Sequence, residues 1–166
     1  VYCPGSINLR PFRGLKPEAF EADLQINFIN LVKVIQAVLP NLTAGEQSSI
    51  VLFSSVAASM GMPFHTSVAA AKGAIEGFAK ALAAEYAPKI RVNVIAPSLT
   101  DTPLADKFLN NETKQEKSAE RHPLKRFGKP EDSAQMASFL LSDKSSWISG
   151  QIFHVDGGMS TLLVNG

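Results

Sequence analysis

The sequence has one cysteine, no excess of either charge and no long uninterrupted apolar run. Because Cys3 is alone, no disulfide can form within the chain, and a reducing compartment is favoured. Sixteen basic and fifteen acidic residues give a formal charge of +1 without any block of like charge, so neither nucleic acid nor an anionic membrane surface is an expected partner. No uninterrupted apolar run approaches the roughly 18 residues of a membrane-spanning helix, and no signal peptide is apparent. We therefore expect a cytoplasmic protein.

Length and composition fit a single globular domain over residues 1–166. Of these residues 45% are hydrophobic and 19% charged, which is ordinary for a domain with a sizeable core. Residues 1–3 are apolar and β-prone and precede a Pro-Gly-Ser turn, so we expect a strand there. Because the chain opens inside this strand and without Met, we expect the domain to be incomplete at its N-terminus.

The central stretch, residues 49–102, predicts a strand, a crossover helix and a second strand. Residues 50–53 are a short apolar run that begins with two β-branched side chains, as in a strand covered on both faces. Apolar and small residues recur at spacings of three and four over residues 66–86, which predicts a helix, and residues 90–96 predict the next strand. Polar residues gather where these strands end, and open α/β sheets bind their ligands at that edge.

The flanking segments complete an α/β pattern. A long amphipathic helix is predicted from Pro17 onward, and Pro40 is expected to end it. Residues 103–126 are polar, with two short helical patterns, and we expect them to form a substrate lid. A helix from Pro130 and a strand over residues 151–155 follow. This order predicts an α/β fold with a doubly wound parallel sheet.

Four segments, in this order along the chain, resemble the short-chain dehydrogenase/reductase family. They are SSVAASMG with Lys72 seventeen residues after Ser55, then IRVNVIAPSLTDTPL, PLKRFGKPEDSAQMASFLLSD and ISGQIFHVDGG. The resemblance covers essentially the whole length and implies a Rossmann-like fold that binds NAD or NADP. The family begins with a strand and a Gly-rich turn that holds the cofactor pyrophosphate, and this sequence lacks that first βαβ portion. The chain therefore resembles the C-terminal two-thirds of a family member.

The family's phosphate-binding loop is rich in glycine, and the spaced glycines Gly73 and Gly77 lie inside the predicted helix over residues 66–86. A phosphate-binding loop is not expected within a helix. These glycines instead belong to a small-residue face, which in the family packs against another subunit. We therefore expect a homodimer or homotetramer.

The family's hydride chemistry uses an Asn, a Ser, a Tyr and a Lys, and three of the four have counterparts here. Asn27, Ser55 and Lys72 match the family positions. In the family the Lys lowers the pKa of the Tyr and holds the cofactor ribose, the Ser orients the substrate carbonyl, and the Asn helps to seat a proton-relay water. The Tyr position, four residues before Lys72, is occupied by Val68. A valine can neither donate nor accept a proton, so the family's mechanism cannot run through this position.

Three interpretations of Val68 are open. In the first, another group supplies the proton: His65, with an unperturbed pKa near 6.5, is the leading candidate, ahead of Thr66, Ser67 or a bound water. In the second, the protein is a catalytically inactive cofactor-binding or assembly subunit. In the third, Lys72 and Ser55 alone polarise the carbonyl, at a rate reduced by about 10² to 10⁴-fold.

The resemblance implies cofactor contacts at several further positions. Those expected to contact the cofactor, besides Lys72, are Gly5, Pro97, Leu99 and Thr102. Ser98 replaces a glycine that the family usually has after this proline.

Purely structural roles are also open for some residues. Asn27 could be a buried structural amide, Ser55 or Thr102 a cap, and Lys72 a side chain that reaches solvent. We further expect Asn93 to bridge neighbouring strands and Arg126 to pair with Glu131.

The expected function is that of an NAD(P)-dependent oxidoreductase with an atypical catalytic site, acting on a small carbonyl or alcohol. No metal site is expected. The alternative is an inactive relative that retains the scaffold.

Overall fold

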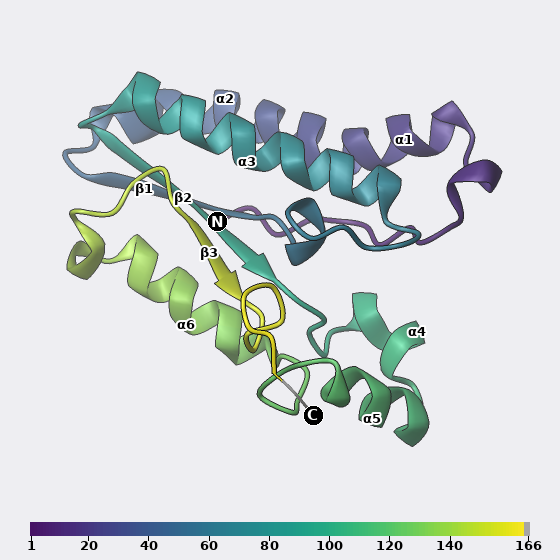
Figure 1. The fold of residues 1–166 in the computed structure, drawn as a ribbon. Coiled ribbons are helices and arrows are strands. Elements are labelled where there is room, and N and C mark those ends of the chain that lie inside the picture. Colours follow the sequence, from purple (N-terminus) through teal and green to yellow (C-terminus); the bar gives the residue numbers. More distant parts are fainter. Residues whose placement is uncertain (165–166) are drawn as a thin grey trace.

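A computed structural model describes residues 1–164 and contains a parallel three-stranded sheet (Figure 1). The strands are β1 (Ser48–Phe53), β2 (Ile90–Pro97) and β3 (Ile152–Val155), in that order across the sheet. Ser48 of β1 is aligned with Ile90 of β2, and Val94 of β2 with Ile152 of β3. Residues 92–96 of β2 are all buried, because helices cover both faces of the sheet.

Helices cover the two faces with separate apolar clusters (Figure 1). One face carries α2 (Asn30–Ala44) and α3 (Thr66–Tyr86), which pack with Leu31, Ile35 and Ile75 against the sheet. The other face carries α6 (Pro130–Leu141), whose Ala137 and Leu140 pack against Val51 and Ile95. The expected α/β fold with a doubly wound, Rossmann-like parallel sheet is confirmed.

Shorter elements connect these layers. They are α1 (Pro17–Leu24), the π-helical turn η2 (Gln25–Ile29), α4 (Asp106–Leu109), α5 (Glu112–Glu120) and the 3-10 turns η1 (Phe12–Gly14), η3 (Val56–Ala58), η4 (Pro103–Ala105) and η5 (Asp143–Ser145). The short helices α4 and α5 agree with the two helical patterns in residues 103–126.

Two expectations about local structure are wrong. Pro40 does not end the long helix, which continues to Ala44. Proline removes one backbone donor, and here the carbonyl that loses its partner belongs to Gln36, an exposed residue of the helix, where water can replace the bond. Residues 1–3 form only an isolated bridge, in which Tyr2 pairs with Leu52, because Pro4 has no N–H with which to continue a ladder.

The elements α1, η2 and α2 join into one helical run, Pro17–Ala44. By length and composition this run of 28 residues could cross a membrane, although no uninterrupted apolar stretch suggested it. It carries the buried polar side chains of Asp23 and Asn27, and its buried Leu31 and Ile35 belong to the core cluster. These contacts are those of a helix that packs against the sheet of its own domain.

Candidate active site at the carboxyl ends of the strands

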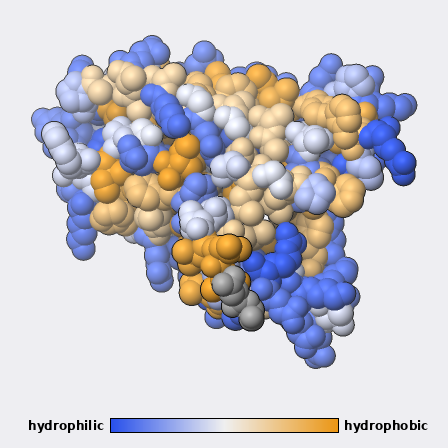
Figure 2. Space-filling model, in the orientation of Figure 1, coloured by the Kyte–Doolittle hydropathy of each residue, from blue (hydrophilic) through white to orange (hydrophobic). Residues whose placement is uncertain are grey.

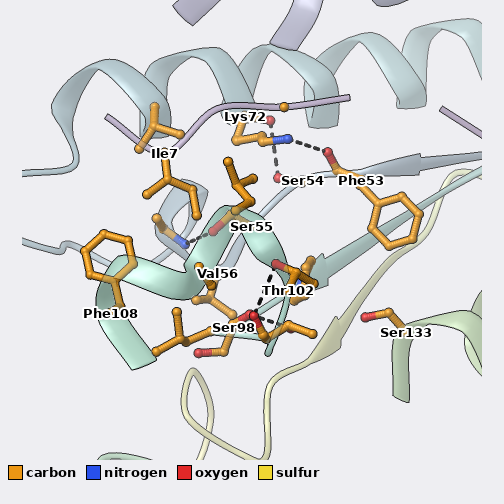
Figure 3. A pocket seen from close by; sticks show the side chains of 18 of the residues that line it. Ile7, Phe53, Ser54, Ser55, Val56, Lys72, Ser98, Thr102, Phe108 and Ser133 are labelled. Carbon is orange, nitrogen blue, oxygen red and sulfur yellow. Dashed lines mark hydrogen bonds between the residues drawn. The ribbon is translucent and has the colours of Figure 1, made fainter. Parts of the chain in front are cut away.

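A cavity of about 990 Å³ opens where β1 and β2 end. Its lining is mainly apolar and includes nearly all of the residues that the sequence singled out: Gly5, Ser55, His65, Val68, Lys72, Pro97, Leu99 and Thr102. Figure 3 shows Lys72 extending from α3 toward the end of β1, with Ser55 and Val56 between it and Phe108. Parallel strands bring these residues together because their carboxyl ends share one edge of the sheet.

Lys72 is the buried cation of this cavity. Its ammonium group donates a hydrogen bond of 3.0 Å to the carbonyl oxygen of Phe53, the last residue of β1. Burial lowers the pKa of Lys72 to about 8, and the nearby Cys3 offsets part of this effect. Since Lys72 is only 8% exposed and has this fixed partner, it does not extend to solvent as a surface lysine would.

Asn27 lies directly behind Gly5, within the π-helical turn η2, where the helix departs from its regular hydrogen bonding. Its amide nitrogen donates to the Ser6 hydroxyl and the Asp23 carbonyl oxygen, each at 2.8 Å, and its amide oxygen accepts from the Ser6 N–H at 3.2 Å. A Cβ added at Gly5 would lie 3.2 Å from the Asn27 amide oxygen and 3.4 Å from the Lys72 nitrogen. Glycine at position 5 therefore allows Asn27 and Lys72 to approach the same point.

Asp23 belongs to this network, and the sequence reasoning did not identify it. The Ser6 hydroxyl donates to one Asp23 carboxylate oxygen at 2.7 Å, and the side chain is 3% exposed. The second carboxylate oxygen has no hydrogen-bond partner among residues 1–164. Its position four residues before Asn27 placed both on one helix face, but that spacing alone did not reveal the contact through Ser6.

The two serines at the end of β1 have different environments. The Ser54 hydroxyl is buried and donates to the Glu76 carboxylate at 2.6 Å, so Ser54 ties β1 to α3. The Ser55 hydroxyl lines the cavity and accepts from the Ala57 N–H at 3.2 Å as the cap of η3. A hydroxyl in this position remains able to donate to a ligand oxygen.

Val68 and His65 are on the same side of α3 as Lys72, at spacings of four and seven residues. Val68 is buried and presents only methyl groups to the cavity. His65 is the N-cap residue of α3, and its Nδ1 lies 2.7 Å from the Pro63 carbonyl oxygen. Because a carbonyl oxygen only accepts, Nδ1 carries the hydrogen, and Nε2 is the ring nitrogen that can gain or lose a proton.

The loop after β2 contains a histidine contact that the sequence did not reveal. His122 is buried, with Nδ1 2.7 Å from the Ser118 carbonyl oxygen and Nε2 2.8 Å from the Ser98 hydroxyl. Ser98, at the position where the resemblance expected glycine, therefore connects this loop to the end of α5. In the same loop, the Thr102 hydroxyl makes no capping bond and lines the cavity.

Two structural expectations have different outcomes. Asn93 does bridge neighbouring segments, since it donates to the Ile148 carbonyl oxygen at 2.9 Å and accepts from the Gln151 N–H at 3.1 Å. Arg126 pairs with Asp132, not with Glu131, through two bonds of 2.7 and 2.8 Å. Asp132 is selected because it also accepts the Lys129 N–H at the start of α6, and these contacts lower its pKa to about 2.

The part of the chain that the structure describes contains no group of three or more His, Cys, Asp or Glu side chains that could hold a metal ion.

Comparison with known proteins gives a match over nearly the whole chain. Residues 3–160 match the family model described as enoyl-(acyl carrier protein) reductase. The chain belongs to the short-chain dehydrogenase/reductase family. It is 40% identical over 146 residues to the 3-oxoacyl-[acyl-carrier-protein] reductase FabG of Thermotoga maritima, a match that covers 87% of this chain and 58% of that protein.

Two further family members bear on the site. The inactive 2-(S)-hydroxypropyl-CoM dehydrogenase 2 of Xanthobacter autotrophicus is 36% identical over 144 residues, covering 84% of this chain and 63% of that protein. A gluconate 5-dehydrogenase from Burkholderia cenocepacia, solved in complex with NADP and tartrate, superposes with a TM-score of 0.89 at 27% identity, covering 96% of this chain and 63% of that one. This short-chain dehydrogenase/reductase chain thus spans about three-fifths of the length of these relatives.

Proposed function

We propose that the protein is an NAD(P)-dependent oxidoreductase acting on a small carbonyl compound or alcohol. The observation that carries the proposal is the buried Lys72 ammonium, held by the end of β1 in one cavity with Ser55 and beside Asn27. Family membership supports this interpretation, because the relatives named above include reductases and dehydrogenases. Substrate and activity are proposed for the whole protein, since the chain covers part of each relative's length.

The cavity fits a nicotinamide cofactor. A Cβ at position 5 would lie only 3.2 Å from the Asn27 amide oxygen and 3.4 Å from the Lys72 nitrogen, so glycine leaves its backbone accessible to a cofactor beside these groups. Thr102 also lines the cavity, and its hydroxyl lies 3.4 Å from the Thr100 carbonyl oxygen. In this proposal the cofactor is NAD or NADP and supplies or accepts hydride when bound. The chain's own contacts with it would come from Lys72, from the backbone of Gly5, Pro97 and Leu99, and from the Thr102 hydroxyl.

Proton transfer is assigned to His65 in place of the absent tyrosine. Lys72 and Ser55 would polarise and orient the substrate oxygen, and His65 Nε2 would exchange the proton, since Nδ1 is bound to Pro63. Asn27 would seat a water between this site and solvent. Residues 103–126 would form the substrate lid of a single domain, because Leu104, Phe108 and Arg121 line the cavity from that segment.

The second candidate function is a catalytically inactive family member. The observation in its favour is Val68, which puts methyl groups where the family's mechanism needs a hydroxyl. An inactive relative at 36% identity supports the existence of such members. Either protein would form a homodimer or homotetramer through α3, where a Cβ added at Gly73 or Gly77 would meet nothing within 4 Å. A cytoplasmic location is proposed on the sequence evidence above.

The test is hydride transfer by the full-length protein with NADH and NADPH over a panel of small ketones, aldehydes and alcohols. We expect turnover that falls about 10² to 10⁴-fold in His65→Ala. The matched control is His154→Ala, since His154 is an exposed histidine of β3 outside the cavity lining. Cofactor binding without turnover would instead establish the inactive alternative, and turnover insensitive to His65→Ala would remove His65 from the mechanism.

A further inference from the structure

Helix α5 separates its charges onto two faces. Its acidic side chains recur every fourth residue and share one face: Glu112, Glu116 and Glu120. The basic side chains of Lys114 and Lys117 lie on the other face, together with Ser118 and with Arg121, the C-cap residue of α5. Only the basic face lines the cavity. Hydrophilic side chains gather over α5 at the lower right of the molecule (Figure 2).

The cavity has cations and no carboxylate among the residues of the described chain that line it. The charged members of its lining are Lys72, Lys114, Lys117 and Arg121. Lys114 is already engaged, because its ammonium group donates to the Lys107 carbonyl oxygen and the Asn110 side chain at 2.8 Å. Within residues 1–164, Lys117 and Arg121 have neither a salt bridge nor a side-chain hydrogen bond, since the one ion pair joins Arg126 to Asp132.

These two cations are one helical turn apart and face a largely apolar cavity. Positively charged side chains that line a cleft with low-dielectric walls focus the electrostatic field and attract anions into the cleft. The planar guanidinium group of arginine presents paired donors that fit a carboxylate or phosphate, and a neighbouring lysine ammonium group adds a second positive charge. The apolar side chains that line the same cavity, among them Val56, Leu104 and Phe108, would contact the hydrocarbon part of such a ligand.

We propose that the substrate is an acidic carbonyl compound, with an apolar body and a carboxylate or phosphate group bound by Lys117 and Arg121. This inference rests on the proposed oxidoreductase function and names the substrate class of the same cavity. Lys72 lies on α3, and the two cations lie on α5 and at its C-cap, so the substrate's carbonyl and acidic groups would be held from different elements. The phosphates of the cofactor are a second source of anions, and the test separates the two.

The test compares 5-oxohexanoate with its methyl ester as substrates, using NADPH and the full-length protein. We expect kcat/KM to favour the acid by about tenfold or more, and the double variant Lys117→Gln/Arg121→Gln to lower kcat/KM for the acid about 10 to 100-fold while the ester changes less than about twofold. Raised ionic strength should reduce the preference for the acid. Lys144→Gln is the control, because Lys144 is exposed and outside the cavity lining.

A binding measurement separates failure of the inference from failure of the proposed function. Isothermal titration calorimetry of the NADP-saturated protein with 5-oxohexanoate and with the ester measures binding affinity and needs no turnover. Selective binding of the acid that the double variant abolishes would support the anion site even if no hydride transfer occurs, and would then count against the oxidoreductase function alone. Turnover or binding equal for acid and ester would overturn the inference, as would a double variant that raises the KM for NADPH and leaves the acid unaffected.

Discussion

The two walls of the cavity are built differently. The wall formed by β1 and α3 contains buried polar groups with fixed partners, such as Lys72 on the Phe53 carbonyl, and Asn27 in η2 supports it from behind through Ser6. The wall formed by residues 103–126 consists of short helices with exposed charged side chains. Two of these side chains, Lys117 and Arg121, lack partners in the described chain. Groups that must keep a precise geometry are therefore set in the packed wall, while groups that select a ligand lie where substitution costs little stability.

Replacing the cation of the packed wall should have the largest effect. Lys72→Met keeps most of the side-chain volume and removes the charge, so we expect kcat/KM for carbonyl reduction to fall about 10³-fold. Thermal stability should be unchanged or raised, because a desolvated ammonium group is removed. Lys80→Met, an exposed position on the same helix, is the control for helix effects. Equal losses in both variants would contradict a specific role of Lys72.

A hydroxyl introduced at position 68 tests the same wall through a gain of activity. Val68→Tyr would place a phenol one helical turn from Lys72, and we expect kcat to rise about 10²-fold. Val68→Phe adds the same ring without the hydroxyl and should show no gain. If both variants lose activity equally, the cavity does not admit the ring, and if neither changes the rate, proton transfer does not depend on this position.

The pH dependence reports on Lys72. Its pKa of about 8 lies below the ordinary value of 10.5, so the ammonium form is lost as pH rises through about 8, and we expect kcat/KM for reduction to fall above that pH. The effect on stability has the opposite direction. Between pH 8 and 10.5 the unfolded chain binds more protons at this group than the folded one, so the free energy of unfolding should increase as pH rises. Lys72→Met should lack both features in rate–pH profiles and denaturant titrations.

The contact between His122 in residues 103–126 and Ser98 in the loop after β2 should affect stability more than the catalytic rate. His122→Ala removes the hydrogen bonds that the ring makes with the Ser118 carbonyl oxygen and the Ser98 hydroxyl, and we expect the free energy of unfolding to fall by about 1–3 kcal/mol. Urea titration measures it. A fall in kcat/KM as large as that of Lys72→Met would contradict the distinction between the two walls.

The ion pair after the lid should have the smallest effect. Asp132→Asn removes the pair with Arg126 and weakens the cap of α6, and because the pair is exposed we expect Tm to fall by only about 2–4 °C. The pKa of Asp132 is lowered to about 2, so its contribution is present above the unfolded value of 3.8 and is lost as pH falls from there through about 2. Wild type and variant should therefore converge in Tm below pH 2.

Much of the fold was predictable because its signals are local. The strand at Ile50, the helix over Thr66–Tyr86 and the short helices of residues 103–126 follow from apolar periodicity and helix-start residues. The cavity members Ser55, Val68 and Lys72 followed from spacing along one strand and one helix once the family pattern was aligned. The extension of α2 past Pro40 was missed because a helix end is decided by packing and solvent as well as by propensity.

By itself, the sequence determined the order of strands and helices, the valine four residues before Lys72 and the sorting of charge along residues 112–121, since each depends only on neighbours in the chain. Tertiary structure alone decided that Asp23 holds Asn27 through Ser6, that Ser98 meets His122, and that Arg126 pairs with Asp132. It also decided which face of α5 borders the cavity. The physical reason is that hydrogen bonds and ion pairs depend on distances of about 3 Å between groups, and for residues far apart in sequence these distances are set by the packing of separate elements.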